Sequence, residues 1–402
     1  MNLRGTLALA LSLALGACAL PPKQGAQVSP ISASSTPRRT LRRASGDVHV
    51  RLANLASAKS LEIRDAAGAS VKIERAGAAI VCDGARQAEA RFAERGPWSV
   101  NGRSYRGALL VRPASGASGF EVTNTLDFED YIAGVVASEL VLWSANPETL
   151  RAQAIAARSY AVSALDDRGA RRTDPFLQSD TRDMAYAGAF VPKNEREREI
   201  AAKLARAVES TRGRVLLEGE RVVDARFHAA CGGQTADARD VSPEARFECL
   251  RSVPCPACRK ELGVERESAG EPWSFTAQRA ALDALAQRFR VGTRLERLRP
   301  VALDSGGRWL EVELVGPSGS ARVRFEELRR ALGTDKLLSS AIELTVPRAG
   351  DELGSTLRFE GRGRGHGVGL CQAAARDCAS AGWNAERILA HYYPGARVAD
   401  WR

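Results

Sequence analysis

The change from a strand pattern to a helix pattern at Asp127 constrains the fold of this chain most. Residues 48–111 consist of short alternating stretches, such as VHVRLA and ALLVRP, separated by Gly, Pro or Asp-Ala. Alternation with a period of two predicts strands. After Asp127, apolar residues recur every three or four positions in DFEDYIAGVVASEL and NPETLRAQAIAARSYAVSAL, which predicts helices. We therefore expect an α+β protein, in which a β-rich N-terminal unit (47–115) precedes a core of helices and strands.

Both predicted helices begin with residues that are typical of helix starts. Asp127 is the expected N-cap of the first helix, and acidic residues follow it in the first turn. Asn146 is the expected N-cap of the second helix, with Pro147 at its first position. The sequence also predicts a charged helix around 193–211 and another helix at about 369–381.

The pattern changes again at about residues 271–347. The stretch RWLEVELVGPSGSARVRFEELRRAL predicts two strands around a tight turn and then a short helix. We interpret this segment as a β-rich subdomain inserted into the main unit, residues 116–402. The main unit is expected to resume with a strand at 356–359.

The N-terminus has the composition of an export signal. Residues 1–18, MNLRGTLALALSLALGAC, combine one arginine, an apolar stretch and small residues before Cys18. This arrangement predicts a lipoprotein signal in which acylated Cys18 anchors the chain; a plain signal peptide with an incidental cysteine is the alternative. Residues 19–46, rich in Pro, Ser and Arg, are typical of a flexible tether. We expect an exported lipoprotein of the cell envelope, on the outer membrane and facing the periplasm in a cell with two membranes, because Ala19 follows the cysteine.

The net charge of +10 does not identify a partner by itself. Basic chains often bind nucleic acid, but an exported protein is separated from it. We therefore expect no nucleic-acid partner, and the charge fits an acidic polymer or lipid surface of the envelope.

Glu139 is the first candidate for chemistry. It lies three residues after Val136 and four after Val135, so it continues the apolar stripe of its predicted helix. Loss of hydration in such a position raises the pKa of a carboxyl group, which can then act as a general acid near neutral pH. A position at the rim, in water or paired with an arginine, is the alternative.

The glycine-rich stretch EGRGRGHGVGLCQ, residues 360–372, has the composition of a phosphate-binding loop but not its spacing. Neither G-x-G-x-x-G nor G-K-[ST] occurs in it. We expect its bare backbone to approach a ligand closely and to expose amides at the start of the next helix. His366 is a candidate hydrogen-bond donor to a substrate oxygen, and the alternative is that it holds a buried turn.

One histidine and three cysteines form a candidate metal site. His228-x2-Cys231 and Cys255-x2-Cys258 resemble the two knuckles of a tetrahedral zinc site. Cys371 is an alternative fourth ligand to His228. Disulfides are the other interpretation, because an exported protein can hold them. The seven cysteines after the signal would then leave one thiol unpaired.

Five segments, taken together and in this order, resemble the SpoIID/LytB family. They are DYIAGVVASE (130–139), LRAQAIAARSYA (150–161), FHAACGGQT (227–235), GRGHGVGLCQ (363–372) and ILAHYYPG (388–395). The resemblance covers about 120–400. The family's enzymatic members are lytic transglycosylases that cleave peptidoglycan glycan strands, notably strands without stem peptides. The resemblance implies that Glu139 is the essential glutamate, and that the glycine loop and the HYYPG segment line the glycan cleft.

Under this resemblance the expected reaction breaks MurNAc–GlcNAc bonds, leaves 1,6-anhydroMurNAc ends, and requires no cofactor, so that zinc would be structural. The candidate substrate-binding residues are Arg158, Tyr160, His366, Gln372 and Tyr392. The expected partners are glycan strands, the membrane through the lipid anchor, and a cell-wall amidase. Two other functions stay open: a non-catalytic, glycan-binding enhancer of an amidase, and a structural lipoprotein that tethers the outer membrane to the wall.

The sequence departs from the family pattern at several positions. Met184 in MAYAG stands where the family usually has Gln, and Cys371 stands where Ser is frequent. Ala373 stands where the family commonly has an aromatic residue or Gly, and Ala374 stands where it commonly has Gly. These departures bear on substrate contacts more than on Glu139.

Overall fold

The computed structural model describes residues 46–92, 96–116, 118–171, 175–242, 244–259 and 272–401. The predicted signal segment with Cys18, and the predicted tether up to residue 45, lie outside these residues. All the described residues fall within one unit, Arg42–Arg402. Helices and strands in several sheets make up this unit, which confirms the α+β class. No helix in the described part of the chain is both long and apolar enough to cross a bilayer.

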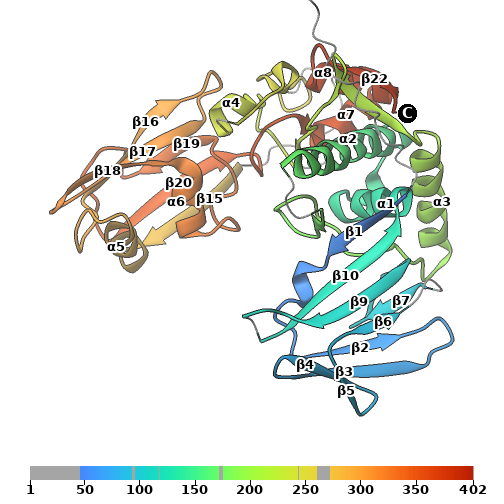
Figure 1. Cartoon of the computed structure of the whole chain (residues 1–402). Coiled ribbons are helices and arrows are strands. Elements are labelled where there is room, and N and C mark those ends of the chain that lie inside the picture. The colour runs from blue at the N-terminus through green and yellow to red at the C-terminus, as the bar shows by residue number, and fades with distance from the viewer. Residues whose placement is uncertain are drawn as a thin grey trace, which may run out of the picture. The chain divides into compact units, whose positions relative to one another are not determined.

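Two sheets form the N-terminal part, in the orders β11-β1-β10-β9-β6 and β5-β4-β3-β2-β7-β8 (Figure 1). Their strands are β1 (Asp47–Arg51), β2 (Ser60–Arg64), β3 (Ser70–Ala76), β4 (Ala79–Cys82), β5 (Ala85–Gln87), β6 (Ala90–Phe92), β7 (Trp98–Val100), β8 (Arg103–Tyr105), β9 (Ala108–Pro113), β10 (Phe120–Asp127) and β11 (Leu177–Gln178). Strand β10 pairs with both β1 and β9. The boundary expected at residue 115 therefore falls inside one sheet, and β10 leads directly into the first helix.

Three helices follow the first sheet: α1 (Phe128–Glu139), α2 (Pro147–Arg171) and α3 (Glu195–Glu209). Both predicted N-caps are confirmed. The Asp127 side chain accepts the amides of Glu129 and Asp130, and the Asn146 side chain accepts the amide of Glu148 at 2.9 Å. The predicted apolar face of α2 is buried from Leu150 to Ala161, and α2 packs against α1 and α3.

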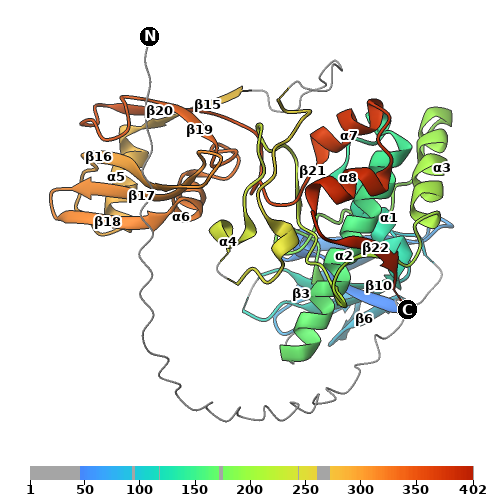
Figure 2. The same ribbon diagram turned by 90° about the horizontal axis from the view of Figure 1, so that it is seen from above.

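In the C-terminal part of the core, α7 and α8 pack on α2, on the side away from α1 in Figure 1, and they lie side by side in Figure 2. Its elements are β12 (Arg214–Glu218), β13 (Arg221–Val222), β14 (Phe227–His228), α4 (Ala238–Val241), β21 (Leu370–Cys371), α7 (Gln372–Ser380), α8 (Ala385–Tyr392) and β22 (Arg397–Asp400). Strands β12 and β13 form an antiparallel hairpin. Parallel pairing of β14 with β21 brings the HAACGG segment beside the end of the glycine loop.

The inserted subdomain consists of two three-stranded sheets and two helices around its own core, which includes Trp309, Leu314 and Phe359. Its elements are β15 (Pro272–Gln278), α5 (Arg279–Arg288), β16 (Arg297–Leu303), β17 (Trp309–Gly316), β18 (Gly319–Arg324), α6 (Phe325–Leu332), β19 (Ile342–Val346) and β20 (Thr356–Arg362). Strand β20 was expected to belong to the main unit, but it pairs with β15 and β19. The subdomain therefore extends to the start of the glycine loop.

Candidate active site

A cavity of about 510 Å³ lies beside the C-terminal end of α1. Its described lining combines the end of α1 with residues 229–230, the start of the glycine loop, the start of α7, and Trp273 of the inserted subdomain. Glu139 carries the only carboxyl group among the described residues that line it, and Arg364 and Arg376 carry guanidinium groups. The cavity therefore presents one acid beside two cations.

The MAYAG segment positions the side chain of Glu139. The backbone amide of Ala185 donates to Glu139 Oε1 at 2.7 Å, and the amide of Ala187 donates to Ser138 Oγ at 2.9 Å. Between them, Tyr186 is buried against α1 at Gly134, where a Cβ atom would lie 2.5 Å from the tyrosine ring. Gly134 thus lets the segment approach close enough for its amides to reach the last turn of α1.

The half-buried position of Glu139 favours its protonated form. Loss of hydration raises the pKa of its carboxyl group, and this effect exceeds the opposing hydrogen bonds from the Ala185 amide and the Gln372 side chain. A carboxyl group that keeps its proton to higher pH can donate that proton to a leaving oxygen. The structure thus gives Glu139 the environment that the apolar stripe predicts.

Gln372 lines the same cavity as Glu139, at the first residue of α7. Its Nε2 atom donates to Gln153 Oε1 at 3.4 Å, which ties it to the middle of α2. Of the five predicted substrate-binding residues, Gln372 is the one that the structure brings to the cavity.

Arg158 does not reach the cavity, and this placement corrects the expectation that it binds substrate. Its side chain is fully buried and donates to both carboxylate oxygens of Glu129, at 2.9 and 2.6 Å. It also donates to the carbonyl oxygen of Arg214 at 3.0 Å. Arg158 therefore joins α2, α1 and β12 as a buried ion pair.

Tyr160 and Tyr392 also lie away from the described cavity lining. The Tyr160 hydroxyl donates to Asp183 Oδ1 at 3.4 Å, in a separate pocket. Tyr392 is fully buried, and its hydroxyl oxygen lies 3.2 Å from Cys255 Sγ. The HYYPG segment thus packs in the core rather than against a ligand at this tyrosine.

His366 holds a turn of the glycine loop. Its Nδ1 atom accepts the amide of Val368 at 3.1 Å, and its ring packs against that of His228 with centroids 5.7 Å apart. Burial lowers the pKa of His366 to about 4, so the ring is neutral at neutral pH. It does not belong to the described cavity lining, and the buried-turn alternative describes it better than a substrate contact.

The glycines of this loop allow it to pack closely on the HAACGG segment. The backbones of Ala230 and Arg364 exchange hydrogen bonds of 3.1 and 2.8 Å. Gly363 has a φ of +76°, and a Cβ atom there would lie 2.6 Å from the Ala230 carbonyl oxygen. At Gly369, with a φ of +71°, a Cβ atom would lie 2.1 Å from the Arg226 carbonyl oxygen. The loop serves backbone packing behind the cavity, which it lines at 363–364.

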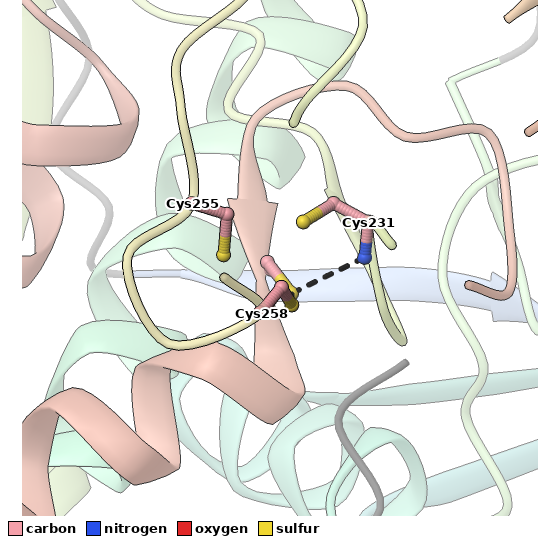
Figure 3. A group of neighbouring side chains, drawn as sticks. Cys231, Cys255 and Cys258 are labelled. Atoms are coloured by element: carbon pink, nitrogen blue, oxygen red, sulfur yellow. Dashed lines mark hydrogen bonds between the residues drawn. The ribbon is translucent and has the colours of Figure 1, made fainter. Parts of the chain in front are cut away.

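Four buried cysteines gather behind the cavity wall. The sulfur atoms of Cys231, Cys255, Cys258 and Cys371 all lie within 4.8 Å of one another, and Figure 3 shows the three labelled side chains converging. His228 is not part of this group. Its Nδ1 atom lies 3.1 Å from the Val368 carbonyl oxygen, and its Nε2 atom is buried without a hydrogen-bond partner among the described residues. Cys371 takes the place that the sequence assigned first to His228. All seven described cysteines are free thiols.

Sequence reasoning missed three contributors to the cavity. The Ala185 amide acts through the backbone, and the MAYAG motif had directed attention to the side chain of Met184, which is buried in the core. Trp273 comes from the inserted subdomain, and nothing in the local sequence connects it to Glu139. Arg364 lies in the glycine loop, where the expectation concerned His366.

The fold and the site together define an α+β protein with one half-buried acid in a cavity between its core and an inserted subdomain. Residues 116–217, which include α1, Glu139 and the MAYAG segment, match the SpoIID family, described as stage II sporulation protein. Residues 116–217 therefore carry a SpoIID domain, in agreement with the family that the five motifs indicate.

Three relatives align with most of the chain. Stage II sporulation protein D of Bacillus subtilis is 27% identical over 280 residues, which cover 68% of this chain and 75% of the relative. The protein of the same name from Bacillus amyloliquefaciens is 26% identical over 299 residues, 72% of this chain and 78% of the relative. An uncharacterized protein of Brachyspira hyodysenteriae is 26% identical over 312 residues, 77% of this chain and 76% of the relative.

Proposed function

We propose that this protein is a peptidoglycan lytic transglycosylase, which cleaves MurNAc–GlcNAc bonds in glycan strands and leaves 1,6-anhydroMurNAc ends. Its similarity to stage II sporulation proteins supports a function related to sporulation and the cell wall. The observation that carries the finer proposal is the single carboxyl group, that of Glu139, in the described cavity lining.

The number of carboxyl groups separates two ways of breaking a glycosidic bond. Most glycosidases use two carboxyl groups, one as acid and the other as nucleophile or as base for water. A transglycosylase that uses a hydroxyl group of its own substrate needs neither a second carboxylate nor a water molecule. One group that first donates and then accepts a proton is sufficient, and we assign both steps to Glu139.

The proposed reaction begins with protonated Glu139. Its proton moves to the oxygen that links MurNAc C1 to the next GlcNAc, and that C1–O bond breaks. The resulting carboxylate takes the proton of the MurNAc C6 hydroxyl group, whose oxygen attacks C1 and closes the 1,6-anhydro ring. The atoms balance without water, and Glu139 ends in the protonated form in which it began.

The polar residues of the cavity suit an anionic saccharide. A MurNAc residue without a stem peptide carries a free lactyl carboxylate, and a guanidinium group binds a carboxylate through charge-assisted hydrogen bonds. Arg364 is exposed at the cavity, and Gln372 is near enough to bond to the Glu139 carboxyl group. Trp273 also lines the cavity, and most of its side chain is buried in the core of the inserted subdomain. These features support strands without stem peptides as the preferred substrate.

The proposed reaction takes place outside the cytoplasmic membrane. Residues 1–18 support an exported lipoprotein anchored through Cys18, with residues 19–46 as a flexible tether from the membrane. We propose that the anchored chain acts on strands that a cell-wall amidase has stripped of peptides.

Digestion of purified glycan strands tests the proposal. Strands with and without stem peptides would be incubated with the wild-type chain, with Glu139→Gln, and with the surface control Glu195→Gln, and the ends read by mass spectrometry. We expect anhydro ends from the wild type and the control, mainly on stripped strands. Glu139→Gln should bind the strands without cutting them.

Two outcomes would contradict the proposal. If Glu139→Gln released as much anhydro product as the wild type, Glu139 would not be the acid. If the wild type bound stripped strands without cutting them and Glu139→Gln still stimulated a purified amidase, the protein would be an enhancer. Binding to whole sacculi, with neither cleavage nor stimulation, would identify a structural tether.

A further inference from the structure

We propose that Cys231, Cys255, Cys258 and Cys371 bind one zinc ion, and that this ion fixes the wall of the cavity that carries Gln372. This site does not depend on the reaction proposed above, because it rests on the arrangement of the four sulfur atoms and on the charge around them. All four side chains are buried, and they come from three separate parts of the chain.

The distances fit a tetrahedral thiolate site. Zinc–sulfur bonds of about 2.3 Å place the sulfur atoms of a tetrahedron about 3.8 Å apart. The Sγ atoms of Cys258 and Cys371 lie 3.9 Å apart, and all four lie within 4.8 Å of one another. A disulfide would need about 2.05 Å between two of them. The group is therefore preformed at the spacing that a metal requires.

The surrounding hydrogen bonds are those that metal-bound sulfur accepts. The amide of Cys231 donates to Cys371 Sγ at 3.3 Å, and the amide of Gly233 donates to Cys231 Sγ at 3.4 Å. The Tyr392 hydroxyl group lies 3.2 Å from Cys255 Sγ, where it can donate. Such contacts around a metal site orient the ligands and stabilise their negative charge.

A buried cation gives a second, independent indication. Arg308 is 2% exposed, and its Nη2 atom donates to the carbonyl oxygens of Cys231 and Gln234. Its Nη1 atom is buried and has no hydrogen-bond partner among the described residues. Burial of a guanidinium group is costly unless negative charge lies near it. Four thiolates around Zn²⁺ carry two negative charges, which offset the charge of Arg308.

The metal site shares its backbone with the cavity wall. Ala229 and Ala230, which line the cavity, directly precede Cys231. Gln372 and Ala373, which also line it, directly follow Cys371. A zinc ion would hold these two segments at a fixed separation behind the cavity. Loss of the ion should therefore loosen the wall opposite Glu139 rather than remove a catalytic group.

X-ray absorption at the zinc edge, on the full-length chain purified under reducing conditions, tests the site without any substitution. We expect about one zinc per chain with four sulfur neighbours at about 2.3 Å. Three sulfur atoms and a nitrogen at about 2.0–2.1 Å would overturn the assignment of Cys371 and return His228 to the site. Stoichiometric iron, or a metal-free chain with disulfides among the four cysteines, would overturn the zinc proposal.

Substitutions with a matched control provide the second test. Cys258→Ser should lower the zinc content severalfold, and it should lower the melting temperature by more than Cys378→Ser does. Cys378 is as deeply buried as the four ligands but lies outside the group, so Cys378→Ser should keep its zinc. Equal zinc content in the two variants would contradict the site. Titration of wild-type thiols with a mercurial reagent should release zinc in step with four modified cysteines, and this readout does not require the variant to fold.

Discussion

The carboxyl group of Glu139 accepts the backbone amide of Ala185 at 2.7 Å, across 46 residues of sequence. This contact fixes the acid through a main-chain donor, which every substitution at residue 185 except proline leaves in place. It opposes the rise in the pKa of Glu139 without cancelling it. The position and the protonation of the acid therefore depend on how closely the MAYAG segment packs on α1.

The raised pKa of Glu139 predicts that the Glu139→Gln variant becomes more stable than the wild type as pH rises. In the wild type, the folded state holds the Glu139 proton to higher pH than the unfolded chain does. The contribution of protonated Glu139 to the stability of the wild type is therefore complete below about pH 4, and it is lost as pH rises through the pKa of the folded state. Glu139→Gln cannot lose a proton. The melting temperature of this variant should be close to that of the wild type at about pH 4 and higher than that of the wild type at about pH 8.

Thermal unfolding at both pH values measures this difference. The exposed control Glu195→Gln should change the melting temperature little at either pH. A Glu139→Gln variant that is less stable than wild type at the higher pH would show that the charged carboxylate is favoured in the folded state. Cleavage by the wild type should also fall as pH rises through the same pKa, because the proton donor is lost.

Gly134→Ala should impair cleavage by displacing the MAYAG segment. An added Cβ atom would lie 2.5 Å from the Tyr186 ring and 2.9 Å from the Gly188 carbonyl oxygen. We expect a loss of about 1–3 kcal/mol in the free energy of unfolding, as for other overpacked sites. We also expect the variant that remains folded to lose activity, because the Ala185 amide moves away from Glu139.

Gly169→Ala is the matched control for this prediction. Gly169 also lies in a helix, α2, but nothing lies within 4 Å of the position of its Cβ atom. This variant should gain about 0.5–1 kcal/mol in the free energy of unfolding, since alanine is the better helix former. Denaturant unfolding of both variants should thus give opposite signs, and a stabilised, fully active Gly134→Ala would contradict the role given to this glycine.

Arg158→Met should act on stability rather than on substrate affinity. Removing the guanidinium group leaves the buried carboxylate of Glu129 without its partner, which typically costs about 3–5 kcal/mol in the free energy of unfolding. Arg198→Met, which breaks an exposed pair with Glu195 on α3, should cost about 0–1 kcal/mol. If Arg158→Met unfolded like wild type but bound glycan weakly, Arg158 would be a substrate contact after all.

Arg364→Gln should weaken binding to strands that carry free lactyl carboxylates. The lost charge-assisted contact should raise the dissociation constant about 10-fold, for a loss of about 1.5 kcal/mol. It should also make binding less sensitive to salt. Arg358→Gln is the control, because Arg358 pairs with Glu360 on β20 and is not part of the described cavity lining. Equal binding by both variants in a titration with stripped strands would contradict a role for Arg364.

Local sequence patterns predicted what local interactions determine. The side chains of Asp127 and Asn146 cap α1 and α2 as expected, because capping involves residues two or three positions away. The spacing from Val135 and Val136 also placed Glu139 on a partly buried helix face. These features need no knowledge of distant partners.

Contacts between distant segments could not be predicted in the same way. Strand β20 joins the inserted subdomain through pairing with β15, which lies about 80 residues earlier in the chain. His228 and Cys371 are register partners in β14 and β21, so both were close to the cysteine group, and only the geometry separates them. Arg158 looked available in the sequence because its partner Glu129 sits on another helix.

Digestion of stripped glycan strands in water labelled with heavy oxygen tests the central claim most directly. If the C6 hydroxyl group of MurNAc is the nucleophile and Glu139 the only acid and base, the new ends should be 1,6-anhydroMurNAc without label. Glu139→Gln should give no new ends. Incorporation of heavy oxygen at the reducing ends would show that water attacks C1, and would contradict the account.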